Sequence, residues 1–471
     1  MFVLYAFLIA IMIAVLDLVF IKSYQLENYK VGNYLKKTIK FEFAFGDKTK
    51  LNFTKRIKRL IFIDFLLKFL IFLIFFGFIN NFWINFVIVF LFVIFSEIIV
   101  VLSFYVVFPL EEFIKKIYIK KAKNKLKDTN CKKIAITGSY GKTSTKNILY
   151  QILKQEFDVC ETPKSFNTPM GICKTILEDL KETDDFLIVE YGARKIGDIE
   201  FLAKNFGVDL GIITPIGNCH LETFGSVENI EKTKYELCEE AKDLVIFNGS
   251  SKSTKKLFNR FSKQKYLVCE ENSYAYAKNI KSSSSGSTFD MVIDNKVFKC
   301  ETKLLGKSNI DNIVVASTMA YLLKESVYNI QKAIKNLKPT PHRLELINGK
   351  FANIIDDSYN SNFDGFMQAL EVLSKFNGNK IVVSPGVVEL GKQQWQVNYD
   401  IGKEIGKVAD FFVIMNQTNK NALFEGAQKG GMTKSNIFFA DTRQQQKMIL
   451  KKLLKAGDVV LFENDFPDNI K

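Results

Sequence analysis

The chain has 471 residues, enough for two or three domains that each bury a core of their own. The formal net charge is +15, but no recognisable nucleic-acid-binding motif accompanies it, so we expect no nucleic-acid partner. The seven cysteines are odd in number and lack C-x-x-C spacing, which argues against a disulfide framework and a zinc site.

Three long apolar runs lie in the first 110 residues, at about 2–21, 60–79 and 83–108. Each is long enough to cross about 30 Å of hydrocarbon at about 1.5 Å per residue. The first run has no basic segment before it and no small-residue cleavage site, so it is typical of a retained anchor. We therefore predict a membrane region over residues 1–110, with three transmembrane helices and a basic cytoplasmic loop.

The distribution of lysine and arginine predicts the orientation of these helices. The 22–59 loop is rich in basic residues, the turn at 80–82 has none, and the 111–128 stretch is again rich in lysine. This pattern predicts a bacterial inner (cytoplasmic) membrane protein whose catalytic domains lie in the cytoplasm. Residues 111–128 alternate lysines with apolar side chains, so we predict a basic amphipathic linker on the lipid bilayer.

Three ionisable residues, Asp64, Lys68 and Glu97, fall within the second and third apolar runs. Such groups are costly inside a membrane and often mark a functional site. The sequence favours an ion pair slightly over a substrate contact, either between Asp64 and Lys68 one helical turn apart or between Lys68 and Glu97 across two helices.

After residue 128, β-rich runs alternate with helical stretches, which predicts an α/β domain with a mainly parallel sheet over residues 129–338. Its first strand, 133–137, runs into the sequence Gly-Ser-Tyr-Gly-Lys-Thr-Ser at 138–144 and then into a helical stretch at 146–153. A glycine-rich turn between a strand and a helix is the setting of a phosphate-binding loop. Its lysine, Lys142, would neutralise phosphate charge, and the hydroxyl of Thr143 would face Mg²⁺.

This loop resembles the short phosphate loop of the Mur ligases, and further segments resemble that family's motifs in the family's order. These segments are 189–193, 214–225, 231–237, 306–312, 342–345, 356–362 and 389–391. The signatures at 356–362 and 389–391 are most similar to the branch that adds D-alanyl-D-alanine to a muramyl tripeptide. The resemblance implies a P-loop central ATPase domain. Beyond residue 338, apolar strands expected near 354, 381–384, 411–415, 437–439 and 459–462 alternate with helical stretches, which predicts a Rossmann-like C-terminal domain at 339–471.

The resemblance implies ATP, two Mg²⁺ ions and a carbamoylated lysine as cofactors. The residues it implies for the nucleotide are Gly138, Ser139, Tyr140, Gly141, Lys142, Thr143, Ser144, Asn309, Asn312, Arg343 and Asp357. Those it implies for the metal ions are Thr143, Glu190, His220 and Lys234, the last as a carbamate. Those it implies for catalysis are Lys142, His220, Lys234 and Arg343.

Several of these assignments have a structural alternative. Glu190 could be an ordinary strand-end charge, His220 a satisfied polar residue and Asp357 a turn former. Lys232 is the rival of Lys234. The 165–171 stretch, which resembles a substrate-positioning loop, could be a simple turn. The residues implied for the substrate are Asn167, Thr168, Tyr359, Asn360 and Asn362.

The implied reaction activates a muramyl-peptide carboxylate as an acyl phosphate and joins it to an amine, D-alanyl-D-alanine. The alternatives are a lipid-linked muropeptide as acceptor, another incoming amine, and a non-catalytic membrane scaffold for other wall-synthesis enzymes. A transporter driven by a P-loop is disfavoured, because residues after 145 carry neither an LSGGQ segment nor a strand ending in Asp-Glu.

Overall fold

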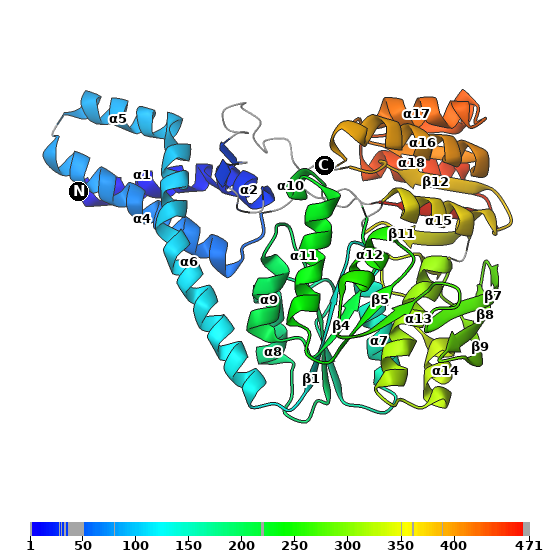
Figure 1. The fold of residues 1–471 in the computed structure, drawn as a ribbon. Helices are drawn as coiled ribbons and strands as arrows, with labels where there is room; N and C mark the ends of the chain where they lie inside the picture. The colour runs from blue at the N-terminus through cyan, green and yellow to red at the C-terminus, as the bar shows by residue number, and fades with distance from the viewer. Residues whose placement is uncertain are drawn as a thin grey trace. The chain divides into compact units, whose positions relative to one another are not determined.

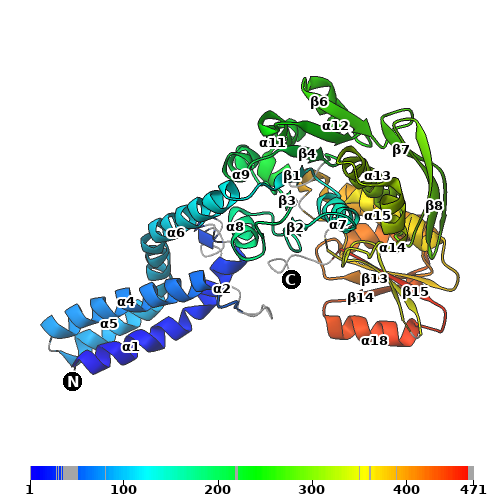
Figure 2. The same ribbon diagram turned by 90° about the horizontal axis from the view of Figure 1, so that it is seen from below.

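The computed structural model describes residues 2–27, 29, 31–32, 34–35, 51–79, 81–217, 221–349, 351–359, 362–388 and 390–464. The chain divides into two compact units, and the boundary falls between Tyr118 and Ile119. The first unit is helical and the second contains two β-sheets with helices packed on them (Figures 1 and 2).

The first unit is built from apolar helices that pack on one another. Ala6, Ala10 and Ile13 bring α1 against Phe72 of α4, and small residues allow the two helices to approach closely. Its helices are α1 (Phe2–Leu16), α2 (Leu18–Leu26), α4 (Lys55–Phe78), α5 (Phe82–Ile94) and α6 (Ser96–Lys127), which continues into the second unit.

The predicted membrane spans are found only in part. One helix in the described residues, Val3–Leu26, is long and apolar enough to cross a membrane by length and composition. A second candidate is the pair Trp83–Val93 and Ser96–Lys127, whose two helices are bent by 66°. The third predicted run is therefore broken near Phe95 and is not one straight helix. Helix α4, which contains the second predicted run, is not among these candidates.

Lys68 lies between two carboxylates inside this helical unit. Its amine contacts Asp64 of the same helix and Asp17 at the junction of α1 and α2. Of the two ion pairs that the sequence left open, the structure contains the Asp64–Lys68 pair. Glu97 is only partly buried. The cross-helix partner of Lys68 is instead Asp17, which no sequence pattern indicated.

The second unit begins with a nine-stranded sheet in the order β2-β3-β1-β4-β5-β6-β7-β8-β9. Strands β2 to β7 run parallel to their neighbours, while β7, β8 and β9 form an antiparallel meander. The strands are β1 (Lys132–Thr137), β2 (Val159–Glu161), β3 (Phe186–Glu190), β4 (Leu210–Ile213), β5 (Leu244–Asn248), β6 (Gln264–Val268), β7 (Ala275–Ser283), β8 (Gly286–Ile293) and β9 (Lys296–Thr302).

Helices cover both faces of this sheet, which explains why its central strands are apolar on both sides. In β1, Ile134 and Ile136 face one core and Ala135 faces the other. One face carries α7 (Lys142–Leu153), α13 (Lys307–Leu322) and α14 (Val327–Asn336). The other carries α8 (Pro169–Glu178), α9 (Asp198–Phe206), α10 (Leu221–Phe224), α11 (Val227–Glu240) and α12 (Lys252–Arg260).

A six-stranded sheet follows, in the order β10-β11-β15-β12-β13-β14, and only the edge strand β10 is antiparallel. The strands are β10 (Glu345–Asn348), β11 (Asn353–Asp357), β12 (Lys380–Ser384), β13 (Phe411–Met415), β14 (Ile437–Ala440) and β15 (Val459–Glu463). The helices are α15 (Phe363–Ser374), α16 (Gln394–Val408), α17 (Lys420–Lys429) and α18 (Arg443–Leu453), with 3₁₀ turns at Gly391–Gln393 and Lys434–Asn436. This arrangement confirms the predicted α/β fold with a Rossmann-like C-terminal part.

The register of the first sheet positions the site. Strands β1 and β3 are parallel neighbours, and Ile136 pairs with Glu190. On its other side β1 pairs with β4, and Thr137 lies opposite Ile213. The residues that follow these three strands therefore meet at the carboxyl edge of the sheet, where open α/β sheets bind their ligands.

Candidate nucleotide and metal site

The phosphate loop requires glycine at both of its ends. Gly138 has φ +147° and Gly141 has φ +76°, a region that side chains rarely adopt. A Cβ at Gly138 would lie 2.0 Å from Oγ1 of Thr214, and one at Gly141 would lie 2.7 Å from Oδ1 of Asn312. The loop is thus packed between β4 and α13 with no room for larger residues.

The loop's amides divide into two groups. Those of Ser139 and Tyr140 donate to the carbonyl of Pro215, at 2.9 and 3.2 Å, so they hold the loop on the residues after β4. The amides at the start of α7 have no carbonyl within their own helix and carry its positive dipole end. The amine of Lys142 donates to the carbonyls of Gly138 and Ser139, both at 3.0 Å, and so bends back over the loop.

A buried carboxylate joins the loop to its neighbouring strand. Glu190, 1% exposed at the end of β3, accepts a hydrogen bond from the hydroxyl of Thr143 at 2.7 Å. Its other oxygen accepts from the side-chain amide of Asn167 at 2.9 Å. Three residues predicted from separate motifs therefore form one contiguous group.

Lys146, which no sequence motif indicated, also lies near Glu190. Its side chain is fully buried and donates to the carbonyls of Thr162 and Lys164, the latter at 2.7 Å. Burial lowers the pKa of Lys146, while the charges of Glu161 and Glu190 oppose that shift. The spacing of Lys146, four residues after Lys142 on the same helix, is the sequence signal that could have identified it.

The two asparagines of α13 are buried near the same helix. Asn312 accepts from the hydroxyl of Thr145 at 3.1 Å and packs beneath Gly141, and Asn309 donates to the carbonyl of Leu305 at 2.9 Å. Asn312 therefore supports the phosphate loop directly, a role not predicted. Contact of either asparagine with adenine stays a prediction.

The remaining predicted metal residues are placed only in part. Lys234 is 4% exposed in α11, whereas its rival Lys232 faces solvent on the same helix. His220 lies outside the described residues, as does Glu389 of the last predicted motif.

Arg343, Asp357 and Tyr359 gather where the second sheet begins. The guanidinium of Arg343 lies 4.2 Å from the ring centre of Tyr359, whose hydroxyl donates to Ser165 at 2.7 Å. Asp357 accepts from the amide of Leu344 at 3.2 Å. Burial raises the pKa of Asp357 to about 6, and the nearby Arg343 partly offsets this effect.

Two predicted substrate residues cap helices. The hydroxyl of Thr168 accepts from the amide of Gly171 at the start of α8, and the side chain of Asn362 accepts from Gly365 at the start of α15. Asn360 lies outside the described residues. The first turns of these helices are thus explained by local capping, whatever else the two side chains contact.

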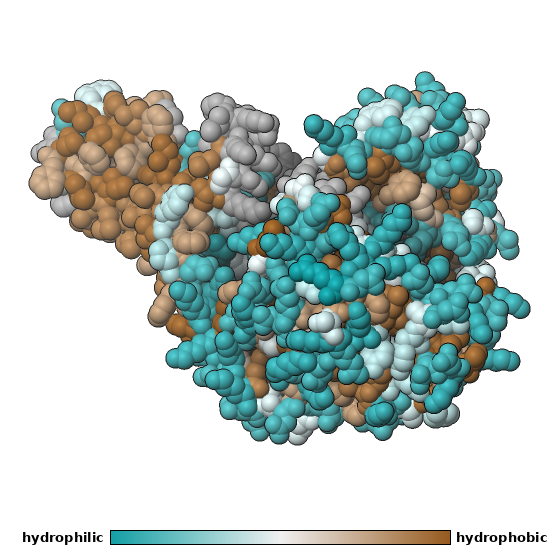
Figure 3. All heavy atoms as spheres, in the orientation of Figure 1, coloured by the Kyte–Doolittle hydropathy of each residue, from teal (hydrophilic) through white to brown (hydrophobic). Residues whose placement is uncertain are grey.

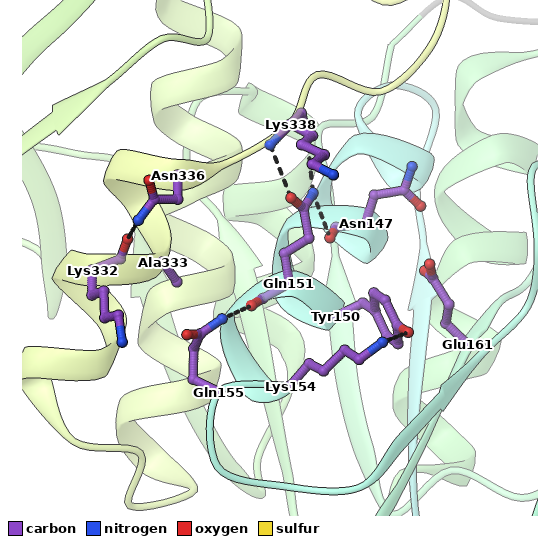
Figure 4. Close-up of a pocket in the computed structure, with 10 residues that line it drawn as sticks. All are labelled: Asn147, Tyr150, Gln151, Lys154, Gln155, Glu161, Lys332, Ala333, Asn336 and Lys338. Carbon is purple, nitrogen blue, oxygen red and sulfur yellow. Dashed lines mark hydrogen bonds between the residues drawn. The ribbon is translucent and has the colours of Figure 1, made fainter.

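The helix that follows the phosphate loop, α7, is also hydrogen-bonded to the chain segment that leads to the second sheet (Figure 4). The side chain of Gln151 donates to the carbonyl of Lys338 at 3.2 Å and accepts from its amide at 2.9 Å. One turn earlier, Asn147 donates to the hydroxyl of Thr340 at 3.2 Å. Asn147, Gln151 and Lys338 line a groove of about 430 Å³ between α7 and α14.

A histidine and two carboxylates lie near one another shortly after the 338–340 segment. The ring Nδ1 of His342 lies 2.8 Å from a carboxylate oxygen of Asp356, and Glu345 accepts from the amide of His342 at 3.1 Å. Among the described residues, these three could together approach a cation, but their contacts with one another already account for their arrangement.

Two family descriptions match the chain. Residues 136–320 match the Mur ligase middle domain, and residues 342–463 match the Mur ligase glutamate ligase domain. The chain is 26% identical over 351 residues to the UDP-N-acetylmuramoyl-tripeptide–D-alanyl-D-alanine ligase of Bacillus subtilis, covering 73% of this chain and 75% of that protein. It is 31% identical over 291 residues to the enzyme of the same name from Buchnera aphidicola, covering 59% of this chain and 61% of that protein.

Among solved structures, the chain is similar to the MurF ligase of Thermotoga maritima in complex with ADP, with a TM-score of 0.67 and 26% identity. The similarity covers 74% of this chain and 80% of that one. Residues 1–118 lie outside both matched family domains.

Proposed function

Because this chain belongs to the Mur ligase family, we propose that it joins D-alanyl-D-alanine to the tripeptide of a muramyl-peptide precursor and converts ATP to ADP and phosphate. The chain is an ATP-dependent ligase of peptidoglycan precursor synthesis. The observation that carries the proposal is the contact of Thr143 and Asn167 with the buried Glu190, directly behind a phosphate loop.

The proposed reaction has two steps. A carboxylate oxygen of the tripeptide attacks the γ-phosphorus of ATP, the bond to the ADP oxygen breaks, and an acyl phosphate forms. The amine of D-alanyl-D-alanine then attacks the acyl carbon, phosphate leaves, and the amine loses a proton. Both steps bring anions together, so the site must gather positive charge. Lys142 and the first amides of α7 supply it at the phosphate loop.

The residues present suit magnesium. Glu190 is a buried carboxylate whose two described hydrogen-bond donors, the Thr143 hydroxyl and the Asn167 amide, are both uncharged. Hydroxyl and carboxylate oxygens are ligands that Mg²⁺ prefers. Thr143 and Glu190 would hold one ion, and His220 and Lys234 would serve a second. Bound magnesium would offset the charge that develops on the phosphate oxygens.

Burial supports a carbamate at Lys234. A buried ammonium group close to Mg²⁺ would repel it, whereas a carbamate would offer an anionic oxygen. Lys232 faces solvent and does not suit this role.

The second sheet would provide the remaining contacts. Arg343 would reach a phosphate, Asp357 would bind ribose hydroxyls, and Tyr359 would line the substrate cleft with Asn167. The bond between the Tyr359 hydroxyl and Ser165 supports this last role, because it joins the C-terminal part to the predicted substrate loop. Closure of the two parts would exclude water, which would otherwise hydrolyse the acyl phosphate.

We also infer that the enzyme is bound to the lipid bilayer and works on its cytoplasmic face. Support comes from the candidate span Val3–Leu26 and from the apolar side chains that gather over the first unit, whereas the visible face of the second unit is mainly hydrophilic (Figure 3). A membrane location favours a lipid-linked muropeptide as a second candidate acceptor, and neighbouring wall-synthesis enzymes as partners.

The decisive experiment measures ADP release by the full-length protein in detergent, with nucleotide-linked or lipid-linked muramyl tripeptide and D-alanyl-D-alanine. We expect ADP and the extended peptide in equal amounts, and no sustained ADP release when the dipeptide is omitted. The matched control is Glu190→Gln, which keeps the shape of the side chain but loses its charge and should lower turnover at least about tenfold to a hundredfold. Absence of turnover with both acceptors would favour the scaffold alternative.

A further inference from the structure

A group of four polar side chains lies inside the apolar helices of the first unit, apart from the ligase site. Asp17 comes from the junction of α1 and α2, Asp64 and Lys68 from α4, and Ser103 from α6. All four residues are 0% exposed. Helix α5 carries no ionisable side chain, and Glu97 of α6 is outside the group.

The charges of this group do not balance if both aspartates are ionised. The Lys68 amine contacts one oxygen of Asp17 and one oxygen of Asp64, so two carboxylates share one ammonium ion. Among the described contacts, Lys68 is the cation that pairs with these two carboxylates. An excess negative charge is strongly unfavourable in an apolar interior, so a further positive charge is expected to bind.

The hydrogen bonds indicate where that charge resides. A hydroxyl carries one proton, and that of Ser103 donates to the carbonyl of Ile99 at 2.7 Å. The same hydroxyl also donates to the remaining oxygen of Asp64, at the longer distance of 3.3 Å. One proton serves both acceptors poorly, and a proton on Asp64 would allow this second contact to run from the aspartate to the serine oxygen. Among the described residues, the second oxygen of Asp17 is buried with no hydrogen-bond partner, so the cluster has fewer donors than two carboxylates can accept from.

We propose that this cluster is a proton-binding site in which Asp64 is un-ionised and donates its proton to the Ser103 hydroxyl. Asp17 and Lys68 then form the one ion pair, and the cluster is neutral. The proton comes from water and no covalent bond other than O–H forms or breaks. The cluster thereby joins α4 to the α1–α2 junction and to α6 without a buried net charge.

Difference infrared spectroscopy tests this on the full-length protein in lipid nanodiscs at neutral pH. The spectrum of the wild type minus that of Asp64→Asn should contain the carbonyl band of an un-ionised carboxylic acid. Ser103→Ala removes the acceptor, so it should shift that band without abolishing it. This second variant keeps the test valid if Asp64→Asn does not fold.

Two further variants should change the intensity of this carbonyl band in opposite directions. Asp17→Asn should abolish the band, because ionised Asp64 then balances Lys68. Lys68→Met should roughly double it, because both aspartates then need a proton. A wild-type spectrum without the band, or a band that persists in Asp64→Asn, would overturn the proposal. If the band is absent and the unfolding temperature rises with Na⁺ but not with K⁺, the bound charge is sodium, which also overturns the proton assignment.

Discussion

Glu190 is the residue through which the phosphate loop, strand β3 and the predicted substrate loop meet. Its two oxygens accept from Thr143 and Asn167, and its place at the end of β3 follows from the register with β1. Removing either neighbour would leave a buried carboxylate with one donor fewer, at a cost of about 1–3 kcal/mol. The geometry of the loop and that of the substrate loop are therefore linked by one side chain.

Lys234 offers a test of the carbamate. We predict that Lys234→Ala lowers kcat at least about a hundredfold, because an anionic ligand is lost, and that short carboxylates in the buffer partly restore it. ADP release with and without added acetate or propionate measures the effect. The matched control is Lys232→Ala on the exposed face of α11, which should keep near-normal activity. Unassisted full activity of Lys234→Ala would contradict the assignment.

Asp357 predicts a pH dependence. Its pKa is raised from 3.8 to about 6, so the folded state binds this proton more tightly than the unfolded state. The resulting gain in the free energy of unfolding is complete below about pH 4 and is lost as the pH rises through 6. For nucleotide binding the sign is opposite, since the ionised carboxylate accepts stronger hydrogen bonds from ribose. We expect ADP affinity, measured by calorimetry, to rise several-fold between pH 5 and 7. The same slope in Asp357→Asn would show that another group titrates.

At the scale of elements, the sequence predicts best what local pattern determines. The phosphate loop and the five parallel strands of the second sheet lie where glycine spacing and apolar runs place them. The β7–β9 meander was not predicted in detail, because its lysines and serines lie at a solvated edge and give no apolar run. The contact of Lys68 with Asp17 joins residues 51 positions apart, which no local pattern reveals.

Helix α7 links the phosphate loop at its start to the 338–340 segment along its side, through Gln151 and Asn147. We predict that Gln151→Ala lowers kcat/KM for ATP several-fold, because Arg343 follows that segment and loses its fixed position. The free energy of unfolding should fall by only about 1 kcal/mol per hydrogen bond lost, as measured by denaturant titration.

The control for this change lies two residues after the end of the same helix. Gln155 is exposed and, in the described structure, its side chain donates to the carbonyl of Gln151, so Gln155→Ala removes no bond to residues 338–340. Its kinetics should match those of the wild type. Equal losses in both variants would mean that α7 is merely destabilised and that the contact with the 338–340 segment has no role in catalysis.

At the scale of the whole molecule, the chain combines an apolar helical unit with a ligase unit that resembles other Mur ligases. Two different forces could hold such a chain at a membrane. Burial of apolar helices is insensitive to salt, whereas attraction of lysines to anionic lipids supplies about 1 kcal/mol per residue and is screened by salt. The lysines of α6 and the helices before them thus make separable contributions.

We predict that the full-length protein stays in the membrane fraction after washing with high salt and with alkaline carbonate, because the Val3–Leu26 span is long and apolar enough to cross a bilayer. Replacing the exposed Lys116, Lys120 and Lys121 by glutamine should leave this retention unchanged, while it weakens binding of the α6 surface to anionic vesicles. Immunodetection of pellet and supernatant measures both proteins. Release of the wild type by salt alone would mean that lysines, and not apolar helices, hold the ligase at the bilayer.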